Sequence, residues 1–465
     1  MTALHRETDT IAAIATAPGT GGIGIIRISG PQARDILGAM FRPFRAGADP
    51  TRESHKLHYG TVVDRGGRVL DEVLAVFMKA PATYTREDVV ELHSHGSYLV
   101  LQAILAEVLA RGARPAEAGE FTKRAFLAGR IDLTRAEAVI DLLQARSTSG
   151  VDLAMGQLQG RLQERVEAVR QGLTKILAIL EVAIDFPDED VEILDSGHLL
   201  ERLARDVEEP LDRLLALADQ GKVLREGISV VIAGRPNVGK SSLLNELLQE
   251  QRALVTEVPG TTRDTIEEMI SIHGIPVHLV DTAGIRAHDD LVEGLGIERA
   301  RRKMDEADLV LFLVDAGTGL TAQDRELYDS VAGRDHIVVL NKTDIAPPDR
   351  LDTLEREFAG VDVVRISCRR QEGIEGLRET MFRHMLGEDA LEERPACAPN
   401  LRHRAVLAKC RDACRRLRQA LQAGAPADLL AVEVQSALDH LGDIVGITTP
   451  EDVLDTIFSR FCIGK

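Results

Sequence analysis

The chain has 465 residues, which predicts about three domains, and its 44% hydrophobic and 28% charged residues are typical of a globular protein. A net charge of −18 is not that of an obvious nucleic-acid binder, and five scattered cysteines exclude a disulfide-rich scaffold and favour a cytoplasmic location. The N-terminus lacks a signal-peptide pattern, and no run of about eighteen apolar residues predicts a membrane span.

The first part of the chain, residues 1–119, predicts an α+β domain. The stretches IAAIATA, GIGIIRI, VLAVFMKA and DVVELHSH are typical of strands, and YLVLQAILAEVLARG is typical of a helix that ends at Gly112. Residues 120–222 predict a helical domain, because apolar residues recur three and four apart in AEAVIDLLQARS and in RLQERVEAVRQGLTKILAILEVAIDF.

Residues 223–384 alternate apolar strands with helices, which predicts a parallel α/β sheet. Residues 385–465 become helical again after the linker EERPACAPN. The predicted fold class is therefore multidomain, with an α+β domain followed by an all-α domain into which an α/β nucleotide-binding domain is inserted.

A P-loop motif lies at the start of the α/β part. GRPNVGKS, from Gly234 to Ser241, follows an apolar strand and opens a helix. In such a loop the backbone N–H groups surround the phosphates, Lys240 reaches the β- and γ-phosphates, and the Ser241 hydroxyl can bind Mg²⁺. The motif predicts a P-loop nucleotide site.

Four further elements follow in the order expected of a GTPase. GTTRD carries Thr262 for Mg²⁺, and DTAG begins with Asp281, which can hold the water shell of the metal. NKTD ends with Asp344, whose carboxylate can accept from guanine N1 and N2, donors that adenine lacks, and SCR would cap the base. The predicted GTP-binding residues are Asn237, Val238, Gly239, Lys240, Ser241, Ser242, Thr256, Glu257, Val258, Pro259, Gly260, Thr261, Thr262, Asp281, Thr282, Ala283, Gly284, Asn341, Lys342, Asp344, Ser367, Cys368 and Arg369.

The predicted catalytic residues differ from those of Ras-like switches. Ile285 follows DTAG where those switches carry a glutamine that orients the attacking water. Glu293 is the candidate for the water, and Arg263 or Arg286 for the transition-state charge. A monovalent cation held by the Asn237 side chain could replace an arginine, although a simple turn explains Asn237 equally well.

A resemblance to a known family rests on eight stretches. GRPNVGKSSLLN, PGTTRDTIEE, VDTAGIR and GIERA resemble GTPases that dimerise through their G domains. APGTGGIGIIRISG, GEFTKRAFLAGRIDLTRAEAV, AIDFPDED and the terminal FCIGK narrow the resemblance to the MnmE (TrmE) family of tRNA modification GTPases. The resemblance covers essentially the whole chain.

The resemblance implies a homodimer that works with an FAD-dependent partner of the MnmG type in a heterotetramer, acts on tRNA and needs no membrane. It implies that a carboxymethylaminomethyl group is added to C5 of the wobble uridine of certain tRNAs. It also implies that the N-terminal domain has a folate-binding-like fold and dimerises, and that it binds a 5-formyl-tetrahydrofolate-type donor.

The same resemblance assigns roles to residues of this sequence. It implies K⁺ ligands at Asn237, Thr256, Val258 and Thr261, Mg²⁺ ligands at Ser241 and Thr262, and a water-orienting role for Glu293. It implies folate contacts at Arg27, Glu91, Arg130 and Lys465, and it places Cys462 near the folate.

Several alternatives stay open at this point. Cys462 is either a catalytic thiol in one-carbon transfer or a packing residue, and His93 and His95 have structural roles or form a metal pair. The basic stretch LRHRAVLAKCRDACRRLRQ is either a tRNA-facing stripe or a solvated helix face. The alternative function for the whole chain is a regulatory GTPase without modification chemistry.

Overall fold

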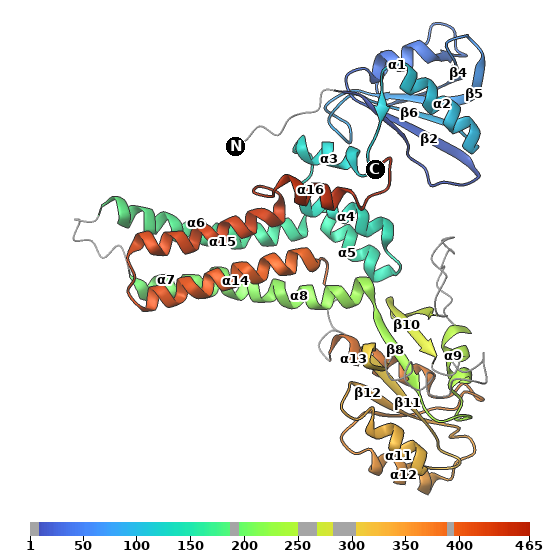
Figure 1. Cartoon of the computed structure of the whole chain (residues 1–465), viewed down its shortest axis with the longest axis vertical. Coiled ribbons are helices and arrows are strands. Elements are labelled where there is room, and N and C mark those ends of the chain that lie inside the picture. Colours follow the sequence, from blue (N-terminus) through green and yellow to red (C-terminus); the bar gives the residue numbers. More distant parts are fainter. Residues whose placement is uncertain (1–8, 187–194, 250–266, 282–303, 388–394) are drawn as a thin grey trace, which may run out of the picture. The chain divides into compact units, whose positions relative to one another are not determined.

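The computed structural model describes residues 9–186, 195–249, 267–281, 304–387 and 395–465 (Figure 1). The chain groups into two compact units, of which the first comprises residues 1–140, 158–199 and 413–465, and the second residues 141–157 and 200–412. The four-domain division given above stays a prediction.

The first unit contains a seven-stranded sheet in the order β3-β4-β5-β6-β2-β1-β7. Neighbouring strands are antiparallel except β1 and β7, which are parallel. The strands are β1 (Ile11–Ile14), β2 (Gly21–Ser29), β3 (Phe41–Pro43), β4 (Lys56–Val63), β5 (Val69–Met78), β6 (Val89–Gly96) and β7 (Arg114–Pro115).

One face of this sheet is covered by helices α1 (Ala33–Met40) and α2 (Tyr98–Ala110). Their apolar residues, such as Leu37 and Ile104, pack on alternate strand residues such as Ile26 and Leu92 to form the core. Side chains alternate along a strand, so the residues between these core positions lie on the opposite face. This face is covered over β1, where Ile11 and Ala13 are buried with Phe121, and we call the rest of it the open face.

The first unit also contains helices. They are α3 (Glu120–Leu127), α6 (Arg161–Asp185), α15 (Ala427–Val445) and α16 (Glu451–Phe458), together with the first residues of α4 (Leu133–Gln144) and of α7 (Ser196–Arg202), whose last residues belong to the second unit. Helix α6 packs along α15, and α3 contacts α16. Leu133 of α4 joins Leu454 and Phe458 of α16 in a small core, so the chain end is built into the first unit.

The second unit contains a six-stranded sheet in the order β13-β12-β11-β8-β10-β9, parallel except for β9. Its strands are β8 (Ile228–Ala233), β9 (Glu267–Ile272), β10 (Ile275–Asp281), β11 (Leu309–Asp315), β12 (His336–Asn341) and β13 (Val363–Arg365). The other elements are α5 (Thr148–Leu158), a π-helix η1 (Leu203–Glu208), α8 (Glu209–Glu226), α9 (Lys240–Gln249), α11 (Ala322–Asp329), α12 (Pro348–Glu357), α13 (Ile374–Leu386) and α14 (Leu401–Gln422), whose last residues belong to the first unit.

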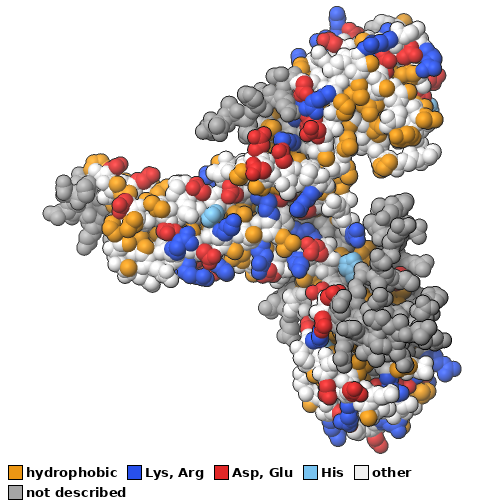
Figure 2. All heavy atoms as spheres, in the orientation of Figure 1, with side chains coloured by type: hydrophobic (Ala, Val, Ile, Leu, Met, Phe, Trp, Pro, Cys, Tyr) orange, Lys and Arg blue, Asp and Glu red, His pale blue; other side chains and the backbone are white. Residues whose placement is uncertain are grey.

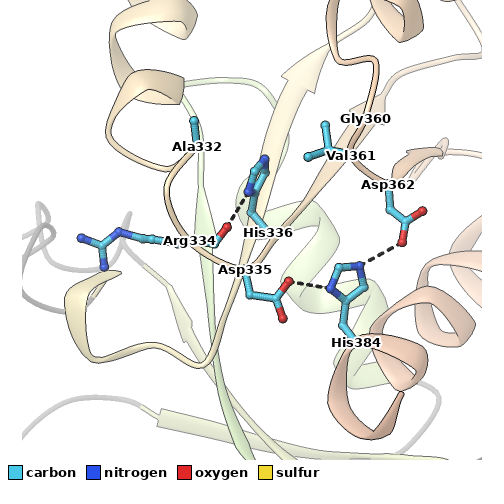
Figure 3. A pocket seen from close by; sticks show the side chains of 8 residues that line it. All are labelled: Ala332, Arg334, Asp335, His336, Gly360, Val361, Asp362 and His384. Carbon is cyan, nitrogen blue, oxygen red and sulfur yellow. Dashed lines mark hydrogen bonds and ion pairs between the residues drawn. The ribbon is translucent and has the colours of Figure 1, made fainter. Parts of the chain in front are cut away.

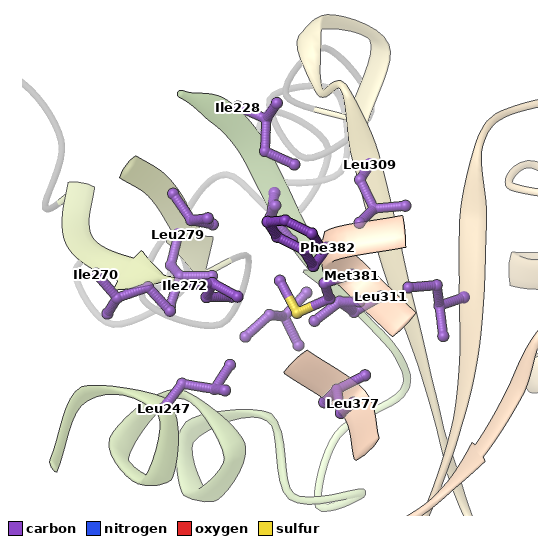
Figure 4. Packing of buried hydrophobic residues seen from close by; sticks show 14 of the residues in the cluster. Ile228, Leu247, Ile270, Ile272, Leu279, Leu309, Leu311, Leu377, Met381 and Phe382 are labelled. Carbon is purple, nitrogen blue, oxygen red and sulfur yellow. The ribbon is translucent and has the colours of Figure 1, made fainter. Parts of the chain in front are cut away.

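Helices cover both faces of this second sheet. On one face Leu247 of α9 and Phe382 of α13 pack against strand residues such as Ile232 and Leu311 (Figure 4). On the other face Leu351 of α12 packs with residues such as Phe312. Such a doubly covered parallel sheet binds ligands at the carboxyl ends of its strands, where the predicted nucleotide motifs lie. No helix within the described ranges combines the length and the apolarity needed to cross a membrane.

Candidate functional site

The predicted P-loop connects β8 to α9. Asn237 has a left-handed backbone with φ of 65°, and Gly239 has φ of 106°. A Cβ atom on Gly239 would lie 2.2 Å from Asn341 Nδ2, so no side chain fits there without a shift. The Lys240 Nζ donates to the carbonyl oxygens of Gly234 at 2.7 Å and Arg235 at 2.9 Å, which keeps the ammonium at the loop.

The guanine-reading motif is tied to the P-loop. The buried Asn341 at the end of β12 donates from Nδ2 to the Val238 carbonyl at 2.8 Å. Its Oδ1 accepts from the backbone N–H of Lys342 at 2.8 Å. Lys342 Nζ donates to the Asn237 carbonyl at 2.8 Å. The loop predicted to read the base and the loop predicted to hold the phosphates are therefore connected by direct hydrogen bonds.

Asp344, the predicted base-reading carboxylate, accepts a hydrogen bond from a residue that follows β13. Ser367, which is fully buried, donates its hydroxyl to Asp344 Oδ1 at 2.8 Å. Next to it, burial and the nearby charge of Glu246 raise the pKa of the Cys368 thiol to about 11. That thiol is neutral at physiological pH, so it does not compete as a charged group with Asp344.

Several predicted site residues lie outside the described residues. They are Thr256, Glu257, Val258, Pro259, Gly260, Thr261, Thr262, Thr282, Ala283, Gly284 and Glu293, together with the candidate arginines Arg263 and Arg286. Asp281 is described only as the last residue of β10. Ser241, Ser242 and Arg369 are exposed beside the motifs already described, and the Ser241 hydroxyl and Asn237 amide offer the oxygen ligands that Mg²⁺ and K⁺ take.

A second group of predicted residues meets in the first unit. Arg27 on β2 and Glu91 on β6 are register partners, and Arg27 Nε lies 2.8 Å from Glu91 Oε1. Both side chains are about one-fifth exposed, at 20% and 18%. Arg27 also lies over the Phe121 ring, 5.7 Å from its centroid, and His93 Nε2 lies 3.3 Å from Glu91 Oε2. This ion pair is thus accessible from the open face of the sheet.

The C-terminal tail docks beside this ion pair. Arg27 Nη1 donates to the Gly464 carbonyl at 3.3 Å, although 437 residues separate them in the chain. Ile463 forms an antiparallel bridge with Ala118, and Gly464 has a left-handed φ of 95°. Cys462, just before these anchors, is exposed. The thiol therefore lies at the surface of this chain, and the choice between a catalytic and a packing role stays open.

Arg130 has a different neighbour from Arg27. Its Nη1 donates to the Tyr84 carbonyl at 3.1 Å, and its guanidinium lies 4.8 Å from the centroid of the Tyr84 ring. Tyr84 packs against the buried cluster that contains Phe121. Arg27 and Arg130 therefore contact the same aromatic cluster without any described contact to each other. Sequence reasoning missed Tyr84 and Phe121, because isolated aromatic residues carry no motif.

The remaining candidates are accounted for by local pairs. His95 Nδ1 lies 2.7 Å from Asp71 Oδ1, and the hydrogen bond with Asp71 and the charge of Asp71 raise the pKa of His95. His93 and His95 thus contact different carboxylates. In the basic helix α14, Arg404 pairs with Asp219 and Arg416 with Glu433.

One pocket of about 450 Å³ lies away from both groups (Figure 3). Several of its lining residues lie at or just before the beginning of β12 and β13, whereas the P-loop follows the end of the parallel strand β8. His384 is hydrogen-bonded to Asp335 at 2.6 Å and to Asp362 at 2.9 Å. These contacts pair His384 with both carboxylates within the pocket.

Comparison with known proteins covers the whole chain. Residues 133–462 match the family model described as MnmE helical domain, and residues 10–130 match the model described as GTP-binding protein TrmE N-terminus. The chain is 50% identical to the tRNA modification GTPase MnmE of Desulfotalea psychrophila over 99% of both chains. It is 47% identical to the protein of the same name from Geotalea uraniireducens, over 98% of this chain and 99% of the relative.

A solved structure of a variant of Aquifex aeolicus Era is 29% identical to this chain and has a TM-score of 0.28. The match covers 40% of this chain and 66% of the Era chain. Because this TM-score is low, the family assignment rests on the relatives and the family models. These matches and the two sheets confirm the predicted multidomain fold class and the GTP-hydrolysing activity in tRNA modification. The chain belongs to the MnmE family of tRNA modification GTPases.

Proposed function

We propose that this chain couples GTP hydrolysis to the transfer of a one-carbon unit onto tRNA. The product is a carboxymethylaminomethyl group on C5 of the wobble uridine. A folate of the 5-formyl-tetrahydrofolate type would donate only the carbon attached to C5, an amine co-substrate of the glycine class would supply the rest, and the FAD-dependent partner would supply the electrons that reduce the formyl carbon. The observation that carries the proposal is the docking of the C-terminal tail beside the Arg27–Glu91 pair. A GTPase that acted only as a switch would have no use for an exposed thiol held at such a polar site.

The residues at the tail suit a folate. Arg27, Arg130 and Lys465 offer positive charge for the glutamyl carboxylates, and Glu91 can accept from pterin N–H groups. The partial exposure of the Arg27–Glu91 pair leaves these groups open to a ligand. The folate would supply the one-carbon unit, while the exposed Cys462 can act on it as nucleophile or acid/base.

The GTPase part acts by positioning and by charge. Lys240 would bind the β- and γ-phosphates, Ser241 and Thr262 would hold Mg²⁺, and Glu293 would orient the attacking water. Asn237, Thr256, Val258 and Thr261 would hold K⁺, whose charge would replace that of an arginine finger and favour G-domain dimerisation. This assignment is supported by the exposed, left-handed Asn237, whose carbonyl accepts from Lys342 and whose side chain contacts no partner among the described residues.

The proposed homodimer has a matching surface on the open face of the first sheet. Ile23, Leu57, Tyr59 and Leu74 lie on or beside this face and are 66%, 52%, 54% and 40% exposed. Figure 2 shows apolar side chains on the surface of this domain. Burying such a surface against a second copy would stabilise the pair, because exposed apolar patches mark interaction sites. The dimer would bind an FAD-dependent partner of the MnmG type and tRNA, and it would work in the cytoplasm.

The test is the modified-nucleoside profile of tRNA from cells that lack this chain, resupplied with the parent chain or with Cys462→Ser. Restoration of the C5-modified wobble uridine by the parent only would place Cys462 in the chemistry. Restoration by both would remove Cys462 from it. If the deletion leaves every uridine unchanged, the regulatory GTPase is the better description.

A further inference from the structure

The segment that links β11 to α11, residues Asp315–Asp324, contacts the P-loop machinery at two places. It belongs to none of the GTPase motifs, and the proposed chemistry gives it no role. We refer to it as the β11–α11 segment.

The first contact fixes Arg235, the second residue of the P-loop motif. Arg235 Nε lies 3.2 Å from Asp324 Oδ2, and Arg235 Nη2 donates to the Thr318 hydroxyl. Asp324 is fully buried, and the Arg235 side chain is 21% exposed. Asp324 also closes the capping box of α11, since its Oδ2 accepts from the Thr321 backbone N–H at 2.9 Å. Arg235 is thereby attached to the first turn of a helix.

The ion pair of Arg235 with Asp324 is not an efficient way to stabilise the fold. Asp324 Oδ1 is buried and has no hydrogen-bond partner within the described part of the chain. A buried charge with incomplete hydrogen bonding keeps part of its desolvation penalty, and well-packed apolar residues often stabilise such a position more. Its location on the P-loop gives it a positional role instead.

The second contact fixes Lys342, which lies in the NKTD motif. Its Nζ lies 2.8 Å from Asp315 Oδ2, and the same Nζ donates to the Asn237 carbonyl at 2.8 Å. The Asp315 side chain is 9% exposed, and its Oδ1 accepts from the Gly317 backbone N–H at 2.9 Å. Because Asp315 is itself held by its own turn, it directs the ammonium onto the P-loop.

Both contacts act on the same short stretch of backbone. Arg235 stands two residues before Asn237, and Lys342 binds the carbonyl of Asn237, which is held at a positive φ that favours glycine. We propose that the β11–α11 segment is a positioning brace for the P-loop: Asp324 and Thr318 hold Arg235, Asp315 holds Lys342, and together they fix the backbone that surrounds the phosphates. Asp315 and Asp324 are positioning residues, since neither lies in a motif that contacts the nucleotide.

The experiment measures how fast the full-length chain releases a fluorescent N-methylanthraniloyl derivative of GDP when challenged with excess unlabelled GDP. The variants are Asp324→Asn, Asp315→Asn and their combination. The matched control is Glu357→Gln, which breaks the exposed pair of Glu357 with Arg325, the neighbour of Asp324 on α11. Thermal unfolding curves followed by circular dichroism identify a temperature at which every variant is folded.

Each aspartate variant is expected to release the nucleotide about tenfold faster, because each removes the negative charge that holds Lys342 or Arg235 in place. Glu357→Gln is expected to stay within about twofold of the parent, because exposed pairs contribute little. The double variant is expected to fall short of the product of the two single effects, since both contacts act on one loop.

Release within twofold of the parent in folded Asp315→Asn and Asp324→Asn would overturn the proposal, even if their Tm falls, because the two residues would then only stabilise the fold. If Asp324→Asn does not fold, Arg235→Gln removes the same contact and leaves the capping box of α11 intact, and the same criterion applies. The readout needs neither folate, K⁺ nor a partner protein, so its failure would leave the proposed one-carbon chemistry untouched.

Discussion

Replacing Gly464 with alanine should detach the C-terminal tail from the first strand. Gly464 has φ of 95°, and a Cβ atom there would lie 2.6 Å from the Ile14 carbonyl oxygen, which belongs to a β-strand and cannot swing away. The left-handed backbone costs an L-residue about 1–2 kcal/mol. Loss of the hydrogen bond from Arg27 to the Gly464 carbonyl adds about 1 kcal/mol. The docked tail is therefore disfavoured by about 2–3 kcal/mol, or roughly 30- to 140-fold.

Hydrogen exchange of the C-terminal peptide, followed by mass spectrometry, measures this docking directly. The amides of Ile463 and Lys465 should exchange faster in Gly464→Ala by about the same factor, provided that exchange follows local opening. Gly424→Ala is the control, because Gly424 also has a positive φ, of 66°, but has nothing within 4 Å of its Cβ position. Unchanged exchange of the tail in Gly464→Ala would refute the reasoning that Gly464 anchors it.

Three further predictions concern other sites. Asp344→Asn should lower the affinity for GTP by about a hundredfold or more, since two hydrogen bonds to a charged acceptor are lost. Competition binding with xanthosine triphosphate measures this change, and unchanged GTP affinity would contradict the base-reading role. GTP hydrolysis should be about tenfold or more faster in KCl than in NaCl, and Asn237→Ala should abolish the difference, whereas equal rates of the parent chain in the two salts would exclude a K⁺ site. Glu120→Gln should destabilise the first unit by about 3 kcal/mol, because the Glu120 side chain is 5% exposed and paired with Arg124 and Arg114.

The Glu120 prediction has a pH signature. Burial raises the pKa of Glu120, but hydrogen bonds from Arg114, the Glu117 backbone and Arg124 lower it more, so the pKa lies below its usual 4.5. A carboxyl group with a depressed pKa in the folded state contributes stability above about pH 4.5 and loses it as the pH falls further. Urea unfolding from pH 7 to pH 3 should therefore show a shallower acid loss in Glu120→Gln than in the parent.

The local motifs were predictable and the long-range contacts were not. Lys240, Asn341 and Asp344 lie at fixed spacings behind apolar strands, so the sequence alone predicted a GTP site at the ends of parallel strands. The contact of Arg27 with Gly464 has no local signal, because it joins the two ends of the chain, and only a family resemblance suggested it.

The positions that brace the P-loop were missed for a different reason. Asp315 is the last residue of an apolar strand and Asp324 lies in the first turn of an ordinary surface helix, so each is explained locally as a turn or cap residue. Their second contacts, with Lys342 and Arg235, depend on the register of β11 beside β8 and β12. Propensity and periodicity carry no information about that register.

The docking of Gly464 beside Arg27 imposes an order on the folding of the first unit during synthesis. All seven strands of the first sheet have been made by Pro115, whereas the segment that borders Arg27 follows the whole second sheet in the chain. Domains fold from the N-terminal end as the chain emerges from the ribosome, so the sheet can form early, and its polar site is completed only after the second unit has been made. A chain truncated before Phe461 would therefore keep its GTP-binding fold and lack the docked segment.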